Sequence, residues 1–200
     1  VGVNLTCYGA IIPKQDNLGG LAAIARKIEA QFGIKLNVIS GGNSSSIHLI
    51  WKEGLPEGIN NLRLGESFLL GNDTAYGETV PGCAHDTMTL EAQIIELKEK
   101  PSLPIGEVGV DAFGEKPYYE DRGMMKRAII AVGKQDTDLG GMHPTDAQIE
   151  IMGGSSDHTI LDVTHADKGY KVGDVVAFTL EYGAMLKLAT SPYVEKAYIK

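Results

Sequence analysis

The chain has 200 residues, a formal net charge of −8 at pH 7 and a hydrophobic content of 43%. This length and composition allow one large domain or two small ones, with an ample core. The acidic balance, without any basic run, argues against nucleic-acid binding. No apolar segment reaches membrane-spanning length, and none forms a signal peptide. Cys7 and Cys83 lack metal-type spacing, and the five histidines form no HxxxH or HExxH pattern. We therefore expect reduced thiols, no metal site and a cytoplasmic protein.

The first 88 residues alternate between strand-like and helix-like segments. Leu21, Ile24, Ile28 and Phe32 recur at helical spacing, which predicts one buried stripe. Gly33 follows as a residue that can end the helix in a left-handed conformation. Alternation of this kind predicts parallel strands joined by right-handed crossover connections, covered on both faces. We expect strands at residues 1–7, 36–40 and 60–65, and helices between Asn17 and Gly33 and at residues 44–51.

Two of these strands end in segments of small residues. One strand runs into Ser40-Gly41-Gly42-Asn43-Ser44, and the next ends in Arg63-Leu64-Gly65. Small side chains let backbone N–H groups converge on an anion, and the helix that follows adds the positive end of its dipole. Because the carboxyl ends of parallel strands meet at one edge, the two segments predict a single phosphate cup. The alternative is a plain turn, since Ser, Gly and Asn are common in turns.

After about residue 89 the pattern changes to short segments of alternating character, separated by Gly, Asp and Pro. This pattern is typical of an all-β module. We expect its strands at residues 90–98, 126–133, 147–152, 159–163 and 175–180, followed by an irregular tail. The chain starts inside a strand-like segment without an initiator Met, so we expect it to be part of a longer protein.

These segments, in order along nearly the whole chain, resemble the C-terminal part of the alanine racemase-like family of fold type III pyridoxal-phosphate enzymes. The likeness is strongest to its ornithine racemase, or predicted amino-acid racemase, branch. The matching segments are Asn4–Gly9, Ser40–Ser44, Arg63-Leu64-Gly65 (Arg-Pro-Gly in alanine racemases), Ser156-Asp157 and the tail from Tyr182 to Tyr198. The resemblance implies the C-terminal part of a (β/α)8 TIM barrel in residues 1–88. It implies a C-terminal β-barrel-like domain in residues 89–181 and a tail at 182–200 that packs back toward the barrel.

The resemblance also implies a cofactor, pyridoxal 5′-phosphate. By this likeness Arg63 lies against the pyridine nitrogen, and Thr6 stands where alanine racemases carry a ring-stacking His. The phosphate would be held by Ser40, Gly41, Gly42, Asn43, Ser44, Gly65, Glu66 (through its backbone) and Tyr182. The alternatives are a surface ion pair for Arg63 and a packing role for Tyr182.

The family's Schiff-base lysine lies on the first barrel strand, for which this chain has no counterpart. Lys134 stands in place of the tyrosine that is the second base of alanine racemases, and His85 is a further candidate proton carrier near the cup. The alternative for Lys134 and for His85 is an ordinary loop residue without a catalytic role. Asp157, with Ser156, matches a position that contacts the distal amine of basic substrates across a dimer in related decarboxylases. The alternative for Asp157 is a turn that it forms with neighbouring polar residues.

The expected activity is therefore that of an amino-acid racemase, an isomerase that removes and returns the Cα proton of a basic amino acid such as ornithine. The resemblance implies a homodimer with shared active sites, and we expect this chain to be inactive by itself. One alternative is a non-catalytic pyridoxal-phosphate-binding or homeostasis protein, against which the all-β module argues. The other is a decarboxylase of the same fold, against which Arg63 argues.

Overall fold

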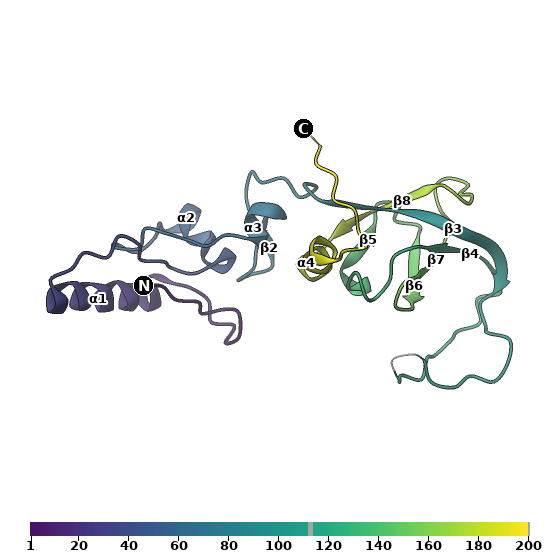
Figure 1. The fold of residues 1–200 in the computed structure, drawn as a ribbon, viewed down its shortest axis with the longest axis horizontal. Coiled ribbons are helices and arrows are strands. Elements are labelled where there is room, and N and C mark those ends of the chain that lie inside the picture. Colours follow the sequence, from purple (N-terminus) through teal and green to yellow (C-terminus); the bar gives the residue numbers. More distant parts are fainter. Residues whose placement is uncertain (112–113, 200) are drawn as a thin grey trace. The chain divides into compact units, whose positions relative to one another are not determined.

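The computed structural model describes residues 1–111 and 114–199, which separate into two units, Val1–Thr87 and Met88–Lys200 (Figure 1). Unit 1 contains helices and very short strands, whereas unit 2 is built around an antiparallel sheet. The elements of unit 1 are α1 (Gln15–Phe32), η1 (Ser44–Ser46), α2 (His48–Lys52), α3 (Glu66–Leu69), β1 (Asn72–Asp73) and β2 (Glu78–Thr79).

The three strands predicted in unit 1 are reduced to single parallel bridges, Gly2↔Ser40 and Ser40↔Asn61. Their parallel order is as predicted, but their length is wrong. The side chain of Asn60 supplements the backbone pairing: its Oδ1 accepts from the Ile39 N–H and its Nδ2 donates to the Asn37 carbonyl. Val38 is 53% exposed, so this segment is not covered on both faces. The described residues form no closed parallel barrel.

Helix α1 ends as predicted, but it buries a different face. Gly33 has φ 60° and donates its N–H to the Glu29 carbonyl, which closes the helix. The predicted stripe is wrong at Ile24 and Phe32, which are 55% and 65% exposed. The buried residues are Leu18, Ala22 and Ala25, which pack with Ile39, Leu49 and Ile59. The alanines present little side-chain volume, so the helix comes close to the chain segment that leads into the predicted cup.

Unit 2 is a six-stranded antiparallel sheet with strand order β5-β8-β3-β4-β7-β6. Five of these strands were predicted, and their alternation places one face in the core; on β3 the buried residues are Leu90, Ala92 and Ile94. The sheet curls, because η2, which leads into β5, packs against β6 at the opposite edge. The bounds are β3 (Thr89–Pro101), β4 (Met124–Ile130), η2 (Leu139–Gly141), β5 (Met142–Pro144), β6 (Glu150–Gly154), β7 (Thr159–Asp162) and β8 (Val175–Leu180).

The prediction of an irregular tail is wrong for its first part, which forms α4 (Tyr182–Thr190). Ala184, Met185 and Leu188 of this helix are buried, and Ala184 and Leu188 join the core of the sheet. The helix is fixed at its end by Ser191, whose hydroxyl donates to the buried Asp136 carboxylate over 2.7 Å. Packing of a short apolar face stabilises this helix. The periodicity of its nine residues did not reveal the helix in the sequence.

Candidate functional site

The structure brings the two predicted cup segments together. The Gly41 N–H donates to the Asn61 carbonyl over 2.9 Å, and the Arg63 N–H donates to the Gly42 carbonyl over 2.9 Å. Further along, the Ser44 hydroxyl accepts from the N–H groups of Gly65 and Ser67, at 3.3 and 3.1 Å. The two segments therefore run side by side through their whole length, as parallel strand ends do.

The glycines of the first segment are required by space and by backbone conformation. A Cβ on Gly41 would lie 2.7 Å from Ile59 Cγ2, and one on Gly42 would lie 2.7 Å from Ser46 Oγ. Gly42 also has φ 118°, a conformation that other residues rarely adopt. Gly65 differs, because a Cβ there would meet nothing within 4 Å. The space next to Gly65 is therefore open.

Arg63 connects three segments of unit 1. Its Nη1 donates to Ser40 Oγ over 2.5 Å, and its Nη2 donates to the Val3 carbonyl over 2.9 Å. Among the described residues Arg63 takes part in no ion pair, so the alternative of a surface ion pair is wrong. The hydroxyl of Ser40 is occupied by this guanidinium. Both contacts hold the planar cation in a defined orientation.

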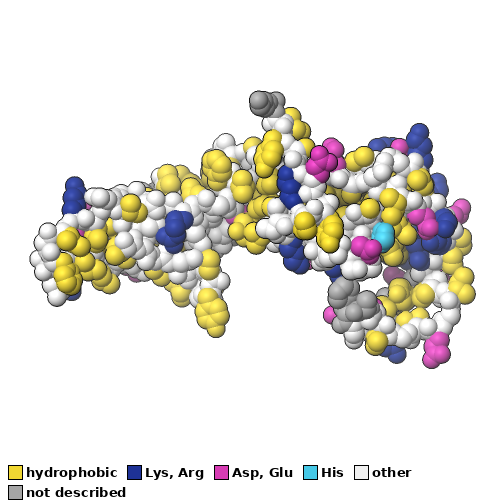
Figure 2. Space-filling view, viewed as in Figure 1, with side chains coloured by type: hydrophobic (Ala, Val, Ile, Leu, Met, Phe, Trp, Pro, Cys, Tyr) yellow, Lys and Arg dark blue, Asp and Glu magenta, His cyan; other side chains and the backbone are white. Residues whose placement is uncertain are grey.

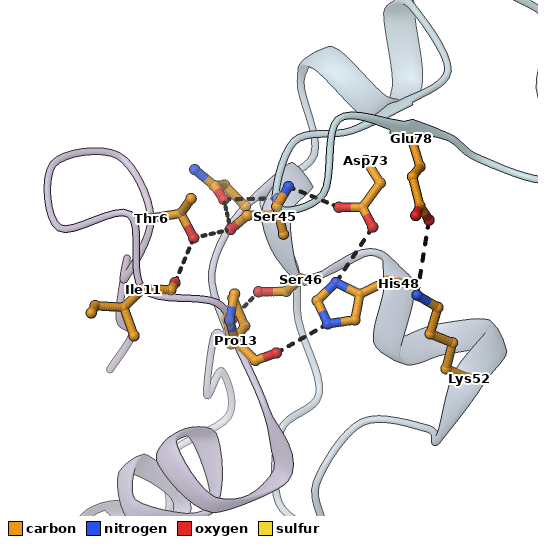
Figure 3. A network of polar contacts seen from close by, with 12 residues as sticks. Thr6, Ile11, Pro13, Ser45, Ser46, His48, Lys52, Asp73 and Glu78 are labelled. Atoms are coloured by element: carbon orange, nitrogen blue, oxygen red, sulfur yellow. Dashed lines mark hydrogen bonds and ion pairs between the residues drawn. The ribbon is translucent and has the colours of Figure 1, made fainter.

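A chain of polar contacts places Thr6 beside the same loop. Thr6 Oγ1 lies 2.8 Å from Ser45 Oγ (Figure 3). Asn43 Oδ1 accepts from both the N–H and the hydroxyl of Ser45, at 3.0 and 2.7 Å. Asn43 Nδ2 donates to Cys7 Sγ over 3.2 Å. The segment that carries Thr6 and Cys7 therefore borders the loop, and Cys7 is a neighbour that sequence reasoning left out.

Two candidates of unit 2, Lys134 and Asp157, lie in adjacent loops. The Lys134 N–H donates to the Ser155 carbonyl over 3.0 Å. A Cβ on the preceding Gly133 would lie 2.5 Å from the Ser156 carbonyl oxygen and from the Asp157 nitrogen. No sequence signal indicated that Lys134 and Asp157 lie close together, because the antiparallel pairing of β4 with β7 creates this proximity.

Asp157 forms the turn that was anticipated as its alternative role. Its Oδ1 accepts from the hydroxyls of Ser155 and Ser156, at 3.0 and 3.3 Å, and lies 3.1 Å from His158 Nδ1. The hydrogen bond from Ser155 lowers the pKa of the Asp157 carboxyl, and the His158 imidazole adds to this effect. The side chain is exposed, so the turn presents an ionised carboxylate to solvent.

The remaining candidates have local contacts within their own units. His85 Nδ1 lies 3.0 Å from the Leu70 carbonyl, in a loop that passes close to Gly71. Glu66 starts α3, and its Oε1 accepts from Asn72 Nδ2 over 3.3 Å. Tyr182 is the first residue of α4 and is partly exposed. No group of three or more His, Cys, Asp or Glu in the described chain could hold a metal ion, and no helix there is long and apolar enough to cross a membrane.

Sequence reasoning missed one buried pair in unit 1. His48 is 3% exposed and Asp73 is fully buried, and His48 Nδ1 lies 3.6 Å from Asp73 Oδ2 (Figure 3). The other ring nitrogen, Nε2, lies 3.0 Å from the Pro13 carbonyl. The residues are far apart in the chain and match no motif. The only signal was their position, since each stands in a short segment that is otherwise apolar or small.

Comparisons with known proteins give relatives along nearly the whole chain, although no family model matches. The chain is 60% identical over 196 residues to ornithine racemase of Acetoanaerobium sticklandii, covering 98% of this chain and 56% of that protein. It is 44% identical over 199 residues to lysine racemase of Thermotoga maritima, covering 99% of this chain and 56% of that protein. The chain thus spans about half the length of the curated relatives that it matches.

Solved structures show the same fold at low identity. Alanine racemase from Bartonella henselae, with covalently bound pyridoxal phosphate, matches with a TM-score of 0.56 and 21% identity over 94% of this chain and 49% of that chain. Alanine racemase from Bacillus anthracis matches with a TM-score of 0.57 and 13% identity over 88% of this chain and 44% of that chain. The chain therefore resembles ornithine racemase and lysine racemase in sequence and alanine racemases in fold.

Proposed function

We propose that this chain is the C-terminal part of a pyridoxal 5′-phosphate-dependent amino-acid racemase that acts on a basic amino acid, ornithine or lysine. The observation that carries the proposal is the 60% identity to an ornithine racemase over 98% of the chain. Identity at this level along the whole chain supports a shared activity more strongly than the fold does, because one fold hosts many activities. The proposed protein is a cytoplasmic homodimer.

In this proposal unit 1 is the last part of a (β/α)8 barrel. Its segments around Gly2, Ser40 and Asn61 lie parallel, and helices α1 and α2 stand between them in the chain, as in βα units. Ile24, Phe32 and Val38 are more than half exposed, so unit 1 has apolar surface that further barrel elements could cover. Unit 2 and its helix α4 correspond to the β-domain and the start of the tail.

The loop at residues 41–44 fits the phosphate of the proposed cofactor. Within the described residues, the backbone N–H groups of Gly42, Asn43 and Ser44 donate no hydrogen bond, although Gly42 and Ser44 are buried. Unpaired N–H groups in a buried loop are costly unless an acceptor satisfies them. The open space beside Gly65 leaves room for such an acceptor. A phosphate supplies several acceptor oxygens and would satisfy these donors.

When bound, pyridoxal phosphate supplies an electron sink that makes the Cα proton of an amino acid more acidic. The residues of this chain bind, orient and move protons around it. The N–H groups of residues 42–44 would hold the phosphate. Arg63, fixed by Ser40 and Val3, would supply the cation beside the pyridine nitrogen. Lys134 would exchange the Cα proton on one face of the substrate, and a second base, from a part of the protein that this chain does not contain, would exchange it on the opposite face, so that the configuration is inverted. By the family resemblance, Tyr182 would provide a further phosphate contact and Thr6 would stand beside the ring.

The test is an assay of the full-length protein loaded with pyridoxal phosphate. We expect L-ornithine or L-lysine to lose its optical rotation and to yield the D-enantiomer in chiral chromatography, and L-alanine to react far more slowly. Cofactor binding without turnover of any amino acid would support the homeostasis protein instead. Release of CO2 and a diamine would identify a decarboxylase.

Asp157 is proposed to bind the distal amine of the basic substrate, contributed across the dimer. Replacing Asp157 with Asn should raise the KM for ornithine about tenfold or more, because a charge-assisted hydrogen bond is lost, while the KM for a short neutral amino acid changes little. Asp167→Asn, another exposed carboxylate of unit 2, is the matched control and should leave both KM values unchanged. Equal effects of Asp157→Asn on the two substrates would leave Asp157 as a turn residue.

A further inference from the structure

Asp136 is a buried carboxyl group in the loop that carries Lys134. Several acidic side chains of unit 2 lie at its surface (Figure 2), but Asp136 is only 4% exposed. Its Oδ1 accepts a hydrogen bond from the Ser191 hydroxyl over 2.7 Å. Ser191 is buried as well, so solvent does not compete for this contact. Because a buried carboxyl group is costly without a hydrogen bond, the contact stabilises one position of the loop.

Asp136 and Lys134 belong to one hydrogen-bonded turn. The Gly133 carbonyl accepts from the N–H groups of Asp136 and Thr137, at 2.9 and 3.1 Å. Lys134 lies inside the ring that these bonds close. A displacement of Asp136 therefore displaces the backbone of Lys134 as well.

A second segment, Ser155-Ser156, holds the same turn through the backbone. The N–H groups of Lys134 and Gln135 donate to the carbonyls of Ser155 and Ser156, at 3.0 and 2.9 Å. Both bonds start from consecutive residues, so alone they would let the turn tilt about the line that joins them. The contact between Asp136 and Ser191 comes from a different segment and restricts this motion.

Ser191 is itself held in place at the end of α4. Ala184 and Leu188 of this helix are buried in the core of the sheet. The Ser191 hydroxyl oxygen accepts from the Tyr193 N–H over 3.1 Å, and its single hydrogen is left for Asp136. The core of unit 2 thus determines, through α4 and Ser191, where the turn lies.

We propose that Asp136 is a positioning residue for Lys134: its hydrogen bond with Ser191 holds the turn from which Lys134 reaches the substrate. This inference rests on the proposed function, in which Lys134 is one of the two bases of a racemase. Asp136 is buried and acts through the backbone of the turn. A base must lie within hydrogen-bond reach of the proton that it removes, and a misplacement of about 1 Å can lower a rate about 100-fold. Loss of the contact should therefore impair proton transfer at one face of the substrate.

Exchange of the Cα proton in D2O separates this role from a general loss of structure. Each base removes the proton of the enantiomer that it faces, and a deuteron from the solvent replaces this proton. With Lys134 out of place, one enantiomer of ornithine should keep its proton, whereas the second base still exchanges the proton of the other enantiomer without inverting it. A loss of structure would slow both exchanges alike. Proton NMR of L- and D-ornithine, incubated with the full-length protein and pyridoxal phosphate, measures the two rates.

In Ser191→Ala, the rate of exchange from one enantiomer should fall about tenfold or more. That enantiomer should be the one that Lys134→Met fails to exchange. The rate from the other enantiomer, the KM and the affinity for pyridoxal phosphate should stay within about threefold of the wild-type values. Asp136→Asn keeps an oxygen that can accept from Ser191, so both of its exchange rates should stay within about threefold of the wild type.

The double variant Asp136→Ala/Ser191→Ala removes both polar groups and leaves no buried carboxyl group unpaired, so it should fold. It lacks the same contact and should show the same loss of exchange from one enantiomer. If Ser191→Ala does not fold, because its buried carboxyl group has lost its partner, the double variant decides.

Thr164→Ala is the matched control. The Thr164 hydroxyl also donates to a carboxyl group of the sheet, that of Asp162, over 2.5 Å. Thr164 lies near the start of β4, whereas Lys134 follows the end of that strand, so both exchange rates should be unchanged. Equal slowing of both enantiomers in Ser191→Ala, or unchanged rates, would overturn the proposal. A large loss in Asp136→Asn would also overturn it, since the hydrogen bond is retained there.

The two proposals fail in different ways. If the wild type racemises no amino acid, or if Lys134→Met still exchanges both enantiomers, the proposed function or its assignment of Lys134 fails, and the inference falls with it. If the wild type racemises ornithine and Lys134→Met loses exchange from one enantiomer only, the proposed function stands. An equal or absent loss in Ser191→Ala and in the double variant then refutes the positioning role alone.

Discussion

Replacing Arg63 with Ala should lower kcat/KM for racemisation by about 100-fold, the loss typical of removing one preorganised electrostatic group from an active site. The guanidinium donates to the Ser40 hydroxyl and to the Val3 carbonyl, so it is fixed before any ligand arrives. Alanine removes the cation and leaves the buried Ser40 hydroxyl without this partner. The measurement is steady-state racemisation of ornithine by the full-length protein with saturating pyridoxal phosphate.

Arg63→Lys is the informative companion variant. Lysine retains the charge but cannot make two contacts with one planar group, so we expect an intermediate activity. Arg26→Ala, at an exposed position of α1, is the matched control and should be as active as the wild type. Activity of Arg63→Ala within about threefold of the wild type would show that Arg63 only ties the segments together.

Replacing Gly133 with Ala should destabilise unit 2 by about 3 kcal/mol, which corresponds to a fall in melting temperature of about 6–12 °C. A Cβ at this position would lie 2.5 Å from the Asp157 nitrogen and the Ser156 oxygen, and 2.6 Å from the His158 nitrogen. All three neighbours are backbone atoms, which cannot rotate away as side chains can. The loop that carries Lys134 must therefore separate from the Ser155–His158 turn.

Gly169→Ala tests whether the destabilisation comes from the close backbone contact at Gly133. A Cβ on Gly169 would meet nothing within 4 Å. The free energy of unfolding of this variant should therefore lie within about 0.5 kcal/mol of the wild-type value. Thermal unfolding followed by circular dichroism measures both variants. Equal melting temperatures for Gly133→Ala and the wild type would mean that the two loops are not packed as described. Racemisation assays on the folded Gly133→Ala protein should also show reduced kcat, since Lys134 follows directly.

Much of the local structure could be predicted from the sequence. The alternation of residues 90–98 identified β3, because a strand with one buried face repeats every two residues. Gly33 marked the end of α1, because only glycine adopts a left-handed backbone there without strain. The small residues at 40–44 and the Arg63-Leu64-Gly65 segment marked the candidate loop. These signals are local, so the amino-acid types alone carry them.

Other features were decided by tertiary structure. The buried face of α1 lies over Ala22 and Ala25 rather than Ile24 and Phe32, because the segments that it packs against require a close approach. Helix α4 forms because Ala184 and Leu188 can pack on the core of the sheet. Neither outcome follows from periodicity, since both depend on surfaces that only the folded chain creates.

The same division applies to the candidate site. The sequence alone determined which residues could form a phosphate loop and that an arginine would stand beside it. Only the folded chain brought Lys134 next to the Asp157 turn and buried His48 against Asp73. The physical reason is that backbone conformation depends on a few neighbouring residues, whereas a buried pair depends on two distant segments whose separation from water is a property of the whole fold.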